Sequence, residues 1–178
     1  ITDYHTAIDD PEITAISVCT PNYCHHTITI DALNAGKHVL CEKPDAIDVS
    51  EVLKMKNAAE EAGKVLMVIR NNRFVTASQY AKKFVEAGRM GEIYCGRCGW
   101  QRRRGIPGKG GWFTTKEQSG GGPLIDLGVH VIDFIRYVTG NPKPVSVYGI
   151  TESRLGDMEG VKVAGKYRAV DADKTEKF

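Results

Sequence analysis

Lys43, Asp126 and His130 are the residues of this sequence whose types and surroundings best suit chemistry. Lys43 follows the short apolar run 39–41 and precedes Pro44, a residue that cannot continue the hydrogen bonding of a strand. A cation beside a buried strand costs free energy unless it has a partner or a task. We therefore interpret Lys43 as a functional residue presented at the rim of a sheet.

Asp126 and His130 lie on one predicted helix, residues 123–140, and share a polar stripe on it. They are four residues apart, and Asp133 follows three residues later, so that the three side chains lie on one face. The other faces are apolar, which predicts burial on nearly every side. A core histidine satisfied by Asp126 is the alternative. The three glycines at 120–122 favour function, because they let backbone approach a ligand or a neighbouring chain closely.

An ammonium, an imidazole and a carboxylate together suit redox chemistry between an alcohol and a ketone. When hydride leaves a carbinol carbon, the hydroxyl proton must leave as well, and a neutral imidazole with a pKa near ~6.5 can accept it. We assign this role to His130. Lys43 would stabilise the developing alkoxide, and Asp126 would fix the imidazole tautomer or hold another hydroxyl.

The elements that must position these side chains begin with an alternation of strands and helices. The predicted strands are 14–21, 38–44 and 65–70, and the predicted helices are 24–36 and 48–62. Asp48 or Ser50 can cap the second helix, and Gly63 ends it. The strands are apolar throughout, which predicts a parallel sheet with right-handed crossovers, covered on both faces. Ligands bind such a sheet at the carboxyl ends of its strands, where Thr20 and Lys43 would lie.

Beyond a boundary that we place near Asn72, strands and helices no longer alternate. The predicted elements are a helix at 78–88, a strand at 92–104, the helix at 123–140, and strands at 144–152 and 160–170. Strands grouped in this way predict a mainly antiparallel, open sheet. The predicted fold class is therefore α/β: a partial Rossmann domain with a doubly wound parallel sheet over residues 1–72, followed by an α+β domain over residues 73–178.

Composition and charge exclude several classes of function. The 178 residues carry a net charge of +2, with 42% apolar and 26% charged residues, so that we expect no nucleic acid and no anionic membrane as partner. No apolar run approaches the ~20 residues that span a bilayer. The five cysteines form no secreted framework, and Cys95 and Cys98 lack a second pair, which predicts a cytoplasmic protein without a metal. Cys19 and Cys41, at strand ends, are expected to be buried.

Four segments resemble the glucose–fructose oxidoreductase / inositol dehydrogenase / rhizopine-catabolism (Gfo/Idh/MocA) family of nicotinamide-dependent oxidoreductases. They are TPNYCHH (20–26), GKHVLCEKP (36–44), NNRF (71–74) and SGGGPLIDLGVHVID (119–133). The resemblance implies that Lys43, Asp126 and His130 form the catalytic group, and that a cis peptide at Pro44 aims Lys43 into the cleft. It implies NAD or NADP as cofactor, with contacts from Thr20, Pro21, Asn22, His25, Glu42, Lys43 and Arg73.

The same resemblance implies sugars, inositols or related polyols as substrates, bound by the second domain. The exposed sheet of that domain, with apolar strands such as 144–152, is expected to form the interface of a homodimer or homotetramer, because apolar sheet faces usually meet a partner. The family's Gly-x-Gly-x-x-Gly motif, which holds the pyrophosphate, does not occur in the sequence. We therefore expect an internal fragment of a protein roughly twice as long, with Ile1–Tyr4 as the family's third strand. Alone, it should bind dinucleotide poorly and be inactive, and the choice between NAD and NADP stays open.

Two alternatives stand beside a sugar or polyol dehydrogenase. The first is an NAD-dependent glycosidase of the same fold, which oxidises its substrate transiently to assist elimination. The second is a non-catalytic sugar-sensing regulatory protein. The presence of Lys43, Asp126 and His130 counts against the sensor, because a sensor needs no proton acceptor.

Overall fold

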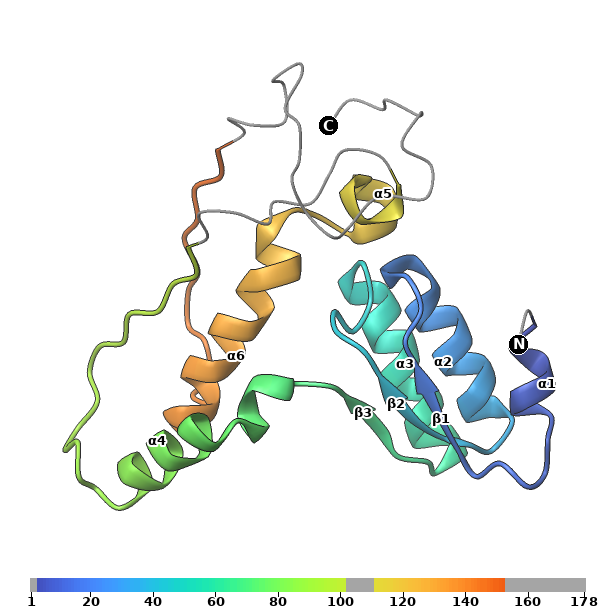
Figure 1. Cartoon of the computed structure of the whole chain (residues 1–178), viewed down its shortest axis with the longest axis horizontal. Coiled ribbons are helices and arrows are strands. Elements are labelled where there is room, and N and C mark those ends of the chain that lie inside the picture. The colour runs from blue at the N-terminus through green and yellow to red at the C-terminus, as the bar shows by residue number, and fades with distance from the viewer. Residues whose placement is uncertain (1–2, 102–110, 153–178) are drawn as a thin grey trace. The chain divides into compact units, whose positions relative to one another are not determined.

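The computed structural model describes residues 3–101 and 111–152, and the chain divides into two compact units (Figure 1). The first unit comprises Ile1–Ile69 together with Trp112–Asp126, and the second comprises Arg70–Gly111 together with Leu127–Phe178. Two stretches far apart in the sequence thus build the first unit, and the later one carries the glycine-rich loop. In the described residues, no helix is long and apolar enough to cross a membrane.

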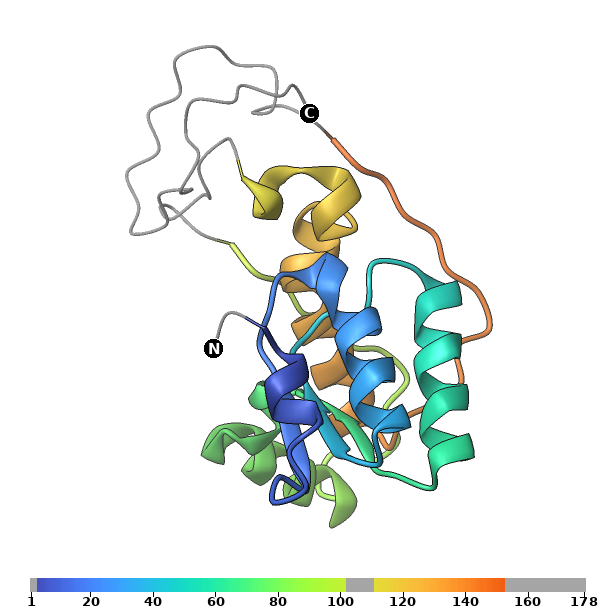
Figure 2. The same ribbon diagram turned by 90° about the vertical axis from the view of Figure 1, so that its right-hand side faces the viewer.

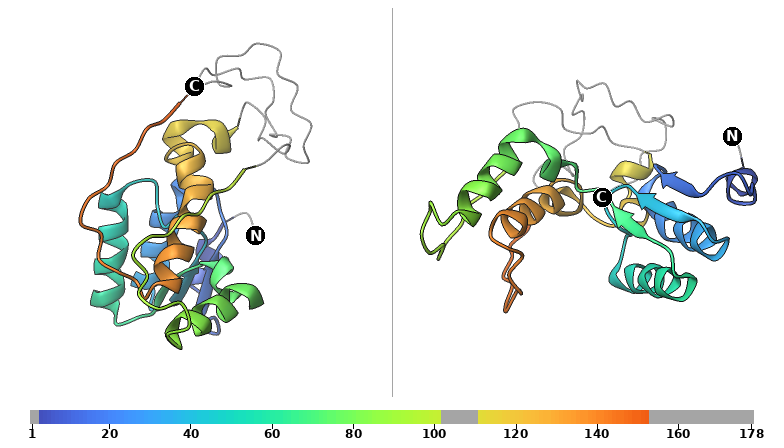
Figure 3. Two further views of the ribbon diagram at one scale, coloured as in Figure 1. Left: turned by 90° about the vertical axis from the view of Figure 1, so that its left-hand side faces the viewer. Right: turned by 90° about the horizontal axis from the view of Figure 1, so that it is seen from below.

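A parallel sheet of three strands, in the order β1-β2-β3, forms the centre of the first unit. The strands are β1 (Ala15–Val18), β2 (His38–Cys41) and β3 (Leu66–Val68), and the crossover helices are α2 (His25–Asn34) and α3 (Val49–Ala62). Both crossovers lie side by side on one face of the sheet (Figure 2, Figure 3). The predicted α/β fold with parallel strands is confirmed.

The prediction that the strands are buried on both faces is wrong for all three, since β1 and β3 also carry exposed residues, and β2 shows the alternation most clearly. Val39 and Cys41 are buried, whereas His38 and Leu40 are exposed, Leu40 to 37%. Successive residues of a strand point to opposite faces, and both crossover helices cover the same face. An apolar run therefore does not by itself reveal how many faces of a strand are covered.

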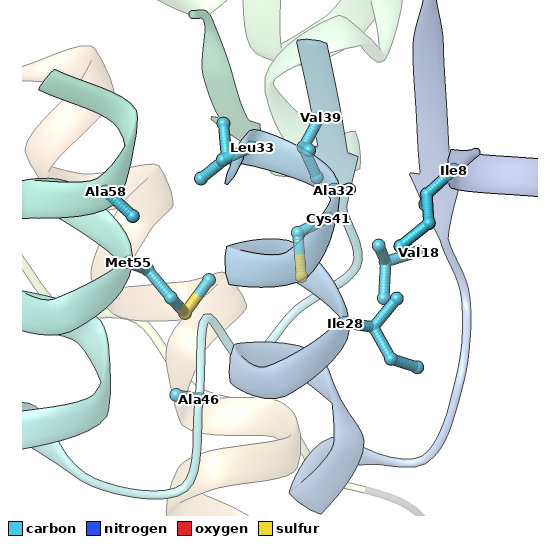
Figure 4. Packing of buried hydrophobic residues seen from close by; sticks show 10 residues of the cluster. All are labelled: Ile8, Val18, Ile28, Ala32, Leu33, Val39, Cys41, Ala46, Met55 and Ala58. Carbon is cyan, nitrogen blue, oxygen red and sulfur yellow. The ribbon is translucent and has the colours of Figure 1, made fainter. Parts of the chain in front are cut away.

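The hydrophobic core of the first unit fills the space between the sheet and the two crossover helices (Figure 4). Its buried side chains are Ile8, Val18, Ile28, Ala32, Leu33, Val39, Cys41, Ala46, Met55 and Ala58. Full burial of a side chain such as Leu33 stabilises the fold by about 1.5–3 kcal/mol relative to exposure. This packing fixes β2, which leads to Lys43, and α2, which begins at His25.

The ends of α3 agree with the caps that the sequence predicts. The Asp48 side chain accepts a hydrogen bond from the backbone N–H of Glu51, and Gly63 adopts the left-handed conformation at φ 60°. Hydrogen bonds from the Ser50 side chain and from the Glu51 backbone lower the pKa of Asp48. The N-terminal strand prediction is wrong at Tyr4, which precedes the short helix α1 (His5–Ile8) and donates to Asp31 at 2.6 Å. Ile1 and Thr2 lie outside the described residues.

Two helices in contact, α4 (Thr76–Glu86) and α6 (Val129–Val138), dominate the second unit, with a 3-10 turn, η2 (Asn71–Phe74), before α4. The strands predicted at 92–104 and 144–152 are not found: residues 92–101 and 144–152 belong to no helix or strand and are exposed. A strand needs a neighbour to complete its hydrogen bonds, and the described residues give these segments none. The strand predicted at 160–170 lies outside the described residues.

Candidate active site

Lys43 and Asp126, two of the three predicted catalytic residues, meet within the first unit. Nζ of Lys43 donates to Oδ1 of Asp126 at 2.8 Å and to the backbone carbonyl of Asp126 at 2.9 Å. The two side chains are only 20% and 29% exposed. A hydrogen bond between an ammonium and a carboxylate is roughly twice as strong as a neutral one. The Lys43–Asp126 pair is therefore a strong hydrogen bond between two partly buried groups.

The end of β2 determines where Lys43 lies. The backbone N–H of Glu42 donates to the carbonyl of Val18 at 2.9 Å and thus extends the sheet by one bond. The Lys43–Pro44 peptide is cis, which confirms the expectation for Pro44. The N–H of Lys43 then donates to the carboxylate of Glu42 at 3.1 Å, and the carbonyl of Pro44 faces Nδ1 of His25 at 2.7 Å. The segment around Lys43 is therefore fixed on both sides.

The glycine-rich loop determines where Asp126 lies. It follows the short helix α5 (Lys116–Ser119), and Gly120 leaves that helix in the left-handed conformation at φ +84°. A Cβ at Gly120 would lie 3.0 Å from Cα of Ile47. The close backbone approach predicted for the glycines is thus present, and for Gly120 it is an approach to the chain's own Ile47.

His130 lies four residues beyond Asp126, on the same helical segment. A π-helical turn, η4 (Leu124–Gly128), contains Asp126 and leads directly into α6, whose first turn contains His130. Asp126 belongs to the first unit and His130 to the second. The sequence predicted one helix over this stretch. It gave no signal for the π-turn, a feature that is frequent at functional sites.

The predicted cofactor contacts Thr20, Pro21 and Glu42 lie just beyond the carboxyl ends of β1 and β2, where a parallel sheet binds its ligands. Oγ1 of Thr20 is buried, and no described residue gives it a hydrogen-bond partner. Buried hydroxyls are nearly always hydrogen-bonded. A polar ligand at this edge of the sheet would satisfy Thr20, so the residues present fit a dinucleotide.

Asn22 and His25, also predicted as cofactor contacts, are more deeply buried, at 7% and 1% exposure. Nδ2 of Asn22 donates to the carbonyl of Ser119 at 2.9 Å. The two ring nitrogens of His25 face the carbonyls of Pro44 and Thr20, at 2.7 and 2.9 Å. Both side chains thus contact backbone. Pattern along the chain carries no signal for the bond from Asn22 to Ser119, which spans 97 residues.

Arg73, the remaining predicted cofactor contact, lies in the second unit in η2. Its guanidinium binds the Asp133 carboxylate through two bonds, Nε–Oδ2 at 2.8 Å and Nη2–Oδ1 at 2.5 Å. This hydrogen bonding raises the pKa of Arg73. Arg70 approaches the same carboxylate at 3.7 Å. The stripe on the predicted helix included Asp133, but only the structure reveals that η2 is held to α6 through it.

Sequence comparisons match both parts of the chain to one family. Residues 1–70 match the oxidoreductase family with an NAD-binding Rossmann fold, and residues 78–173 match the GFO/IDH/MocA C-terminal domain. D-glucoside 3-dehydrogenase of Escherichia coli (strain K12) is 40% identical over 152 residues, which are 85% of this chain and 43% of that protein. Levoglucosan dehydrogenase of Pseudarthrobacter phenanthrenivorans is 38% identical over 142 residues, which are 78% of this chain and 36% of that protein.

A solved structure of levoglucosan dehydrogenase, in complex with NADH and levoglucosan, is similar with a TM-score of 0.69 and 36% identity. The similarity covers 79% of this chain and 38% of that one. The chain thus spans less than half the length of these relatives.

Proposed function

This chain belongs to the GFO/IDH/MocA family of oxidoreductases, and we propose that it serves in an NAD(P)-dependent dehydrogenase acting on a CH–OH group of a sugar, inositol or related polyol. The observation that carries the proposal is the bond between Lys43 and Asp126 in the unit whose main stretch matches the NAD-binding Rossmann fold. The names of the relatives, a glucoside dehydrogenase and a levoglucosan dehydrogenase, support the substrate class.

A bound NAD or NADP supplies the hydride acceptor for oxidation and the hydride donor for the reverse reaction. Thr20, Pro21, Glu42 and Lys43, beyond the carboxyl ends of β1 and β2, would hold it. The buried Oγ1 of Thr20, which has no partner among the described residues, supports this role. The resemblance also names Asn22, His25 and Arg73 as cofactor contacts, but their side chains bond to groups of the protein.

Each proposed catalytic side chain has one task. In the oxidation, the substrate's hydroxyl proton passes to the imidazole of His130 as the carbinol C–H bond breaks and its hydride leaves. The Lys43 ammonium stabilises the negative charge that develops on the substrate oxygen. Asp126 holds that ammonium through its carboxylate and its carbonyl. In the reverse direction His130 returns the proton.

The test is a panel of sugars, polyols and sugar acids incubated with the intact protein and NAD or NADP, with reduced cofactor followed by absorbance. We expect at least one substrate to be oxidised, and we expect the His130→Ala variant to bind it with little or no turnover. Net redox-neutral cleavage of a glycoside with bound cofactor would favour the glycosidase. Sugar binding without turnover by the unaltered protein would favour the sensor and refute the dehydrogenase.

We further propose a homodimer or homotetramer in the cytoplasm. All five cysteines are free thiols, which supports a reducing compartment. Apolar side chains of the exposed segment 144–152 support assembly, because large exposed apolar patches usually meet a partner. Among them, Val145 is 99% exposed and Val147 is 91% exposed. Analytical ultracentrifugation tests the assembly, and a monomer would contradict it.

A further inference from the structure

The Lys43–Asp126 pair joins two loops of the first unit that approach one another directly. One loop runs from Lys43 to Ile47, and the other runs from Ser119 through the glycines to Asp126. The backbone of Gly120 leaves no room for a Cβ beside Ile47, whose Cα, Cβ and carbonyl oxygen would all lie within 3.0–3.1 Å of it. A displacement of either loop therefore moves one member of the pair relative to the other.

His25 holds the first loop. It begins α2 and is 1% exposed, and its Nδ1 lies 2.7 Å from the Pro44 carbonyl, one residue beyond Lys43. Its Nε2 lies 2.9 Å from the Thr20 carbonyl, just past β1. A neutral ring donates from one nitrogen and the cationic ring from both. The cationic ring therefore donates to both backbone oxygens and ties Pro44 to the end of β1, whereas the neutral ring donates to one of them.

Asn22 holds the second loop. It is 7% exposed, and its Nδ2 donates to the carbonyl of Ser119 at 2.9 Å across 97 residues of sequence. Ser119 is itself 3% exposed, and its hydroxyl donates to the carbonyl of Gly121 at 3.0 Å. The amide of Asn22 therefore anchors the loop at the point where it turns towards Asp126.

From these contacts we infer that Asn22 and His25 are positioning residues for the Lys43–Asp126 pair, and that their side chains do not bind the cofactor. The inference rests on the proposed function for the meaning of the pair. Because Lys43 bonds to the main-chain carbonyl of Asp126 as well as to its carboxylate, a shift of the second loop displaces both acceptors at once. Loss of either anchor should therefore impair catalysis while cofactor binding persists.

The experiment compares two variants at each position in the intact protein. Asn22→Asp keeps the shape of the side chain but replaces the donor with an acceptor, and Asn22→Ala removes it. His25→Leu removes both ring nitrogens, whereas His25→Gln keeps a donor. Asn57→Asp, on an exposed position of α3, is the matched control.

We expect kcat to fall roughly 10- to 100-fold in Asn22→Asp, Asn22→Ala and His25→Leu, as is typical when supporting hydrogen bonds of a site are lost. His25→Gln should recover part of that loss. The dissociation constant for NADH, measured by its fluorescence, should stay at the value of the unaltered protein and of the Asn57→Asp control. A raised dissociation constant for NADH with unchanged kcat at saturating cofactor would overturn the inference, because it would make Asn22 and His25 cofactor contacts.

A second measurement does not need turnover. Reductive methylation with formaldehyde and a borane, read by mass spectrometry, compares Lys43 with Lys54 and Lys56, which are exposed on α3. Lys43 should react slowly in the unaltered protein and several-fold faster in the Asn22 and His25 variants that still fold, as judged by circular dichroism. An unchanged Lys43 rate in the folded variants would overturn the inference. Absence of turnover with any substrate would refute the proposed function alone, since the methylation result would still decide the positioning.

Discussion

Asp126 binds Nζ of Lys43 twice, once through its carboxylate at 2.8 Å and once through its own main-chain carbonyl at 2.9 Å. The first bond joins two opposite charges. The second bond joins the ammonium to a neutral carbonyl and therefore only helps to position Lys43. Substitution of Asp126 can remove the first and leave the second. The two contributions are therefore separable by experiment.

The first prediction concerns this separation. Lys43→Met removes the ammonium and should lower kcat roughly 10²- to 10³-fold, as loss of a group that stabilises a developing oxyanion does. Asp126→Asn keeps the main-chain acceptor and should lower kcat less, roughly 10- to 100-fold. Steady-state rates of NAD(P)H formation measure both, with Lys56→Met on an exposed position as control. Equal losses in the two variants would show that the carboxylate, and not the carbonyl, holds Lys43.

The second prediction concerns the close approach of Gly120 to Ile47. Gly120→Ala and Gly63→Ala both place a Cβ on a left-handed residue, at φ +84° and +60°, which costs about 1–2 kcal/mol. At Gly63 nothing lies within 4 Å of the added carbon, whereas at Gly120 it meets Ile47 at 3.0 Å. We expect an extra loss of about 1–3 kcal/mol at Gly120 alone. Urea unfolding measures the difference between the two variants. Equal losses of stability would mean that the backbone at Gly120 moves away from Ile47 without a cost in free energy.

The third prediction concerns the ion pair that holds η2 to α6. Arg73→Met leaves Asp133 with Arg70 at 3.7 Å, and Asp133→Leu leaves two guanidinium groups without that carboxylate. The double variant removes both charges, so its loss of stability should be smaller than the sum of the two single losses. Because the Arg73 side chain is 39% exposed, we expect a coupling on the order of 1 kcal/mol. Thermal unfolding of the four proteins measures it, and strict additivity would exclude a stabilising pair.

The fourth prediction concerns cysteine reactivity. Burial raises the pKa of the Cys41 thiol to about 11, so at pH 8 roughly one thiol in a thousand is the reactive thiolate. Iodoacetamide should therefore label the exposed Cys19, Cys95 and Cys98 in the native protein long before Cys41. Labelling of Cys41 should become faster as the pH rises towards 11. At pH 8, Cys41 should be labelled only after the protein has been unfolded. Peptide mass spectrometry follows each site. Early labelling of Cys41 at pH 8 would contradict its burial.

The three strands and the two crossover helices of the first unit could be predicted because short stretches of sequence specify them. Asp48 and Gly63 mark the two ends of α3, and the Lys43–Pro44 step marks the end of β2. Such signals act between neighbours along the chain, so a single sequence is enough to recognise them. The position of Lys43 just beyond β2 followed in the same way, whereas the π-helical turn that contains Asp126 did not.

Contacts between distant residues could not be predicted in this way. The bond from Asn22 to Ser119 spans 97 residues, and the bond from Arg73 to Asp133 spans 60. The apolar run 39–41 also could not show whether β2 is covered on one face or on two. In the structure one face is exposed, and Leu40 lies on it. Cys19 was predicted to be buried but is exposed. The strand β1 ends one residue earlier, at the buried Val18, and successive residues point to opposite faces. Each error arose where tertiary packing, and not local pattern, decides the outcome.

The first unit is assembled from two separated stretches of chain, and this fixes an order of events during synthesis. The sheet and its two crossover helices are complete once Ile69 has left the ribosome. The acceptor of Lys43 lies 83 residues further along the chain and is synthesised later. Closing so long a loop costs conformational entropy, which other contacts must offset. A longer nascent chain, from which Ile69 but not yet Asp126 has left the ribosome, therefore carries all three parallel strands before Lys43 can meet its acceptor.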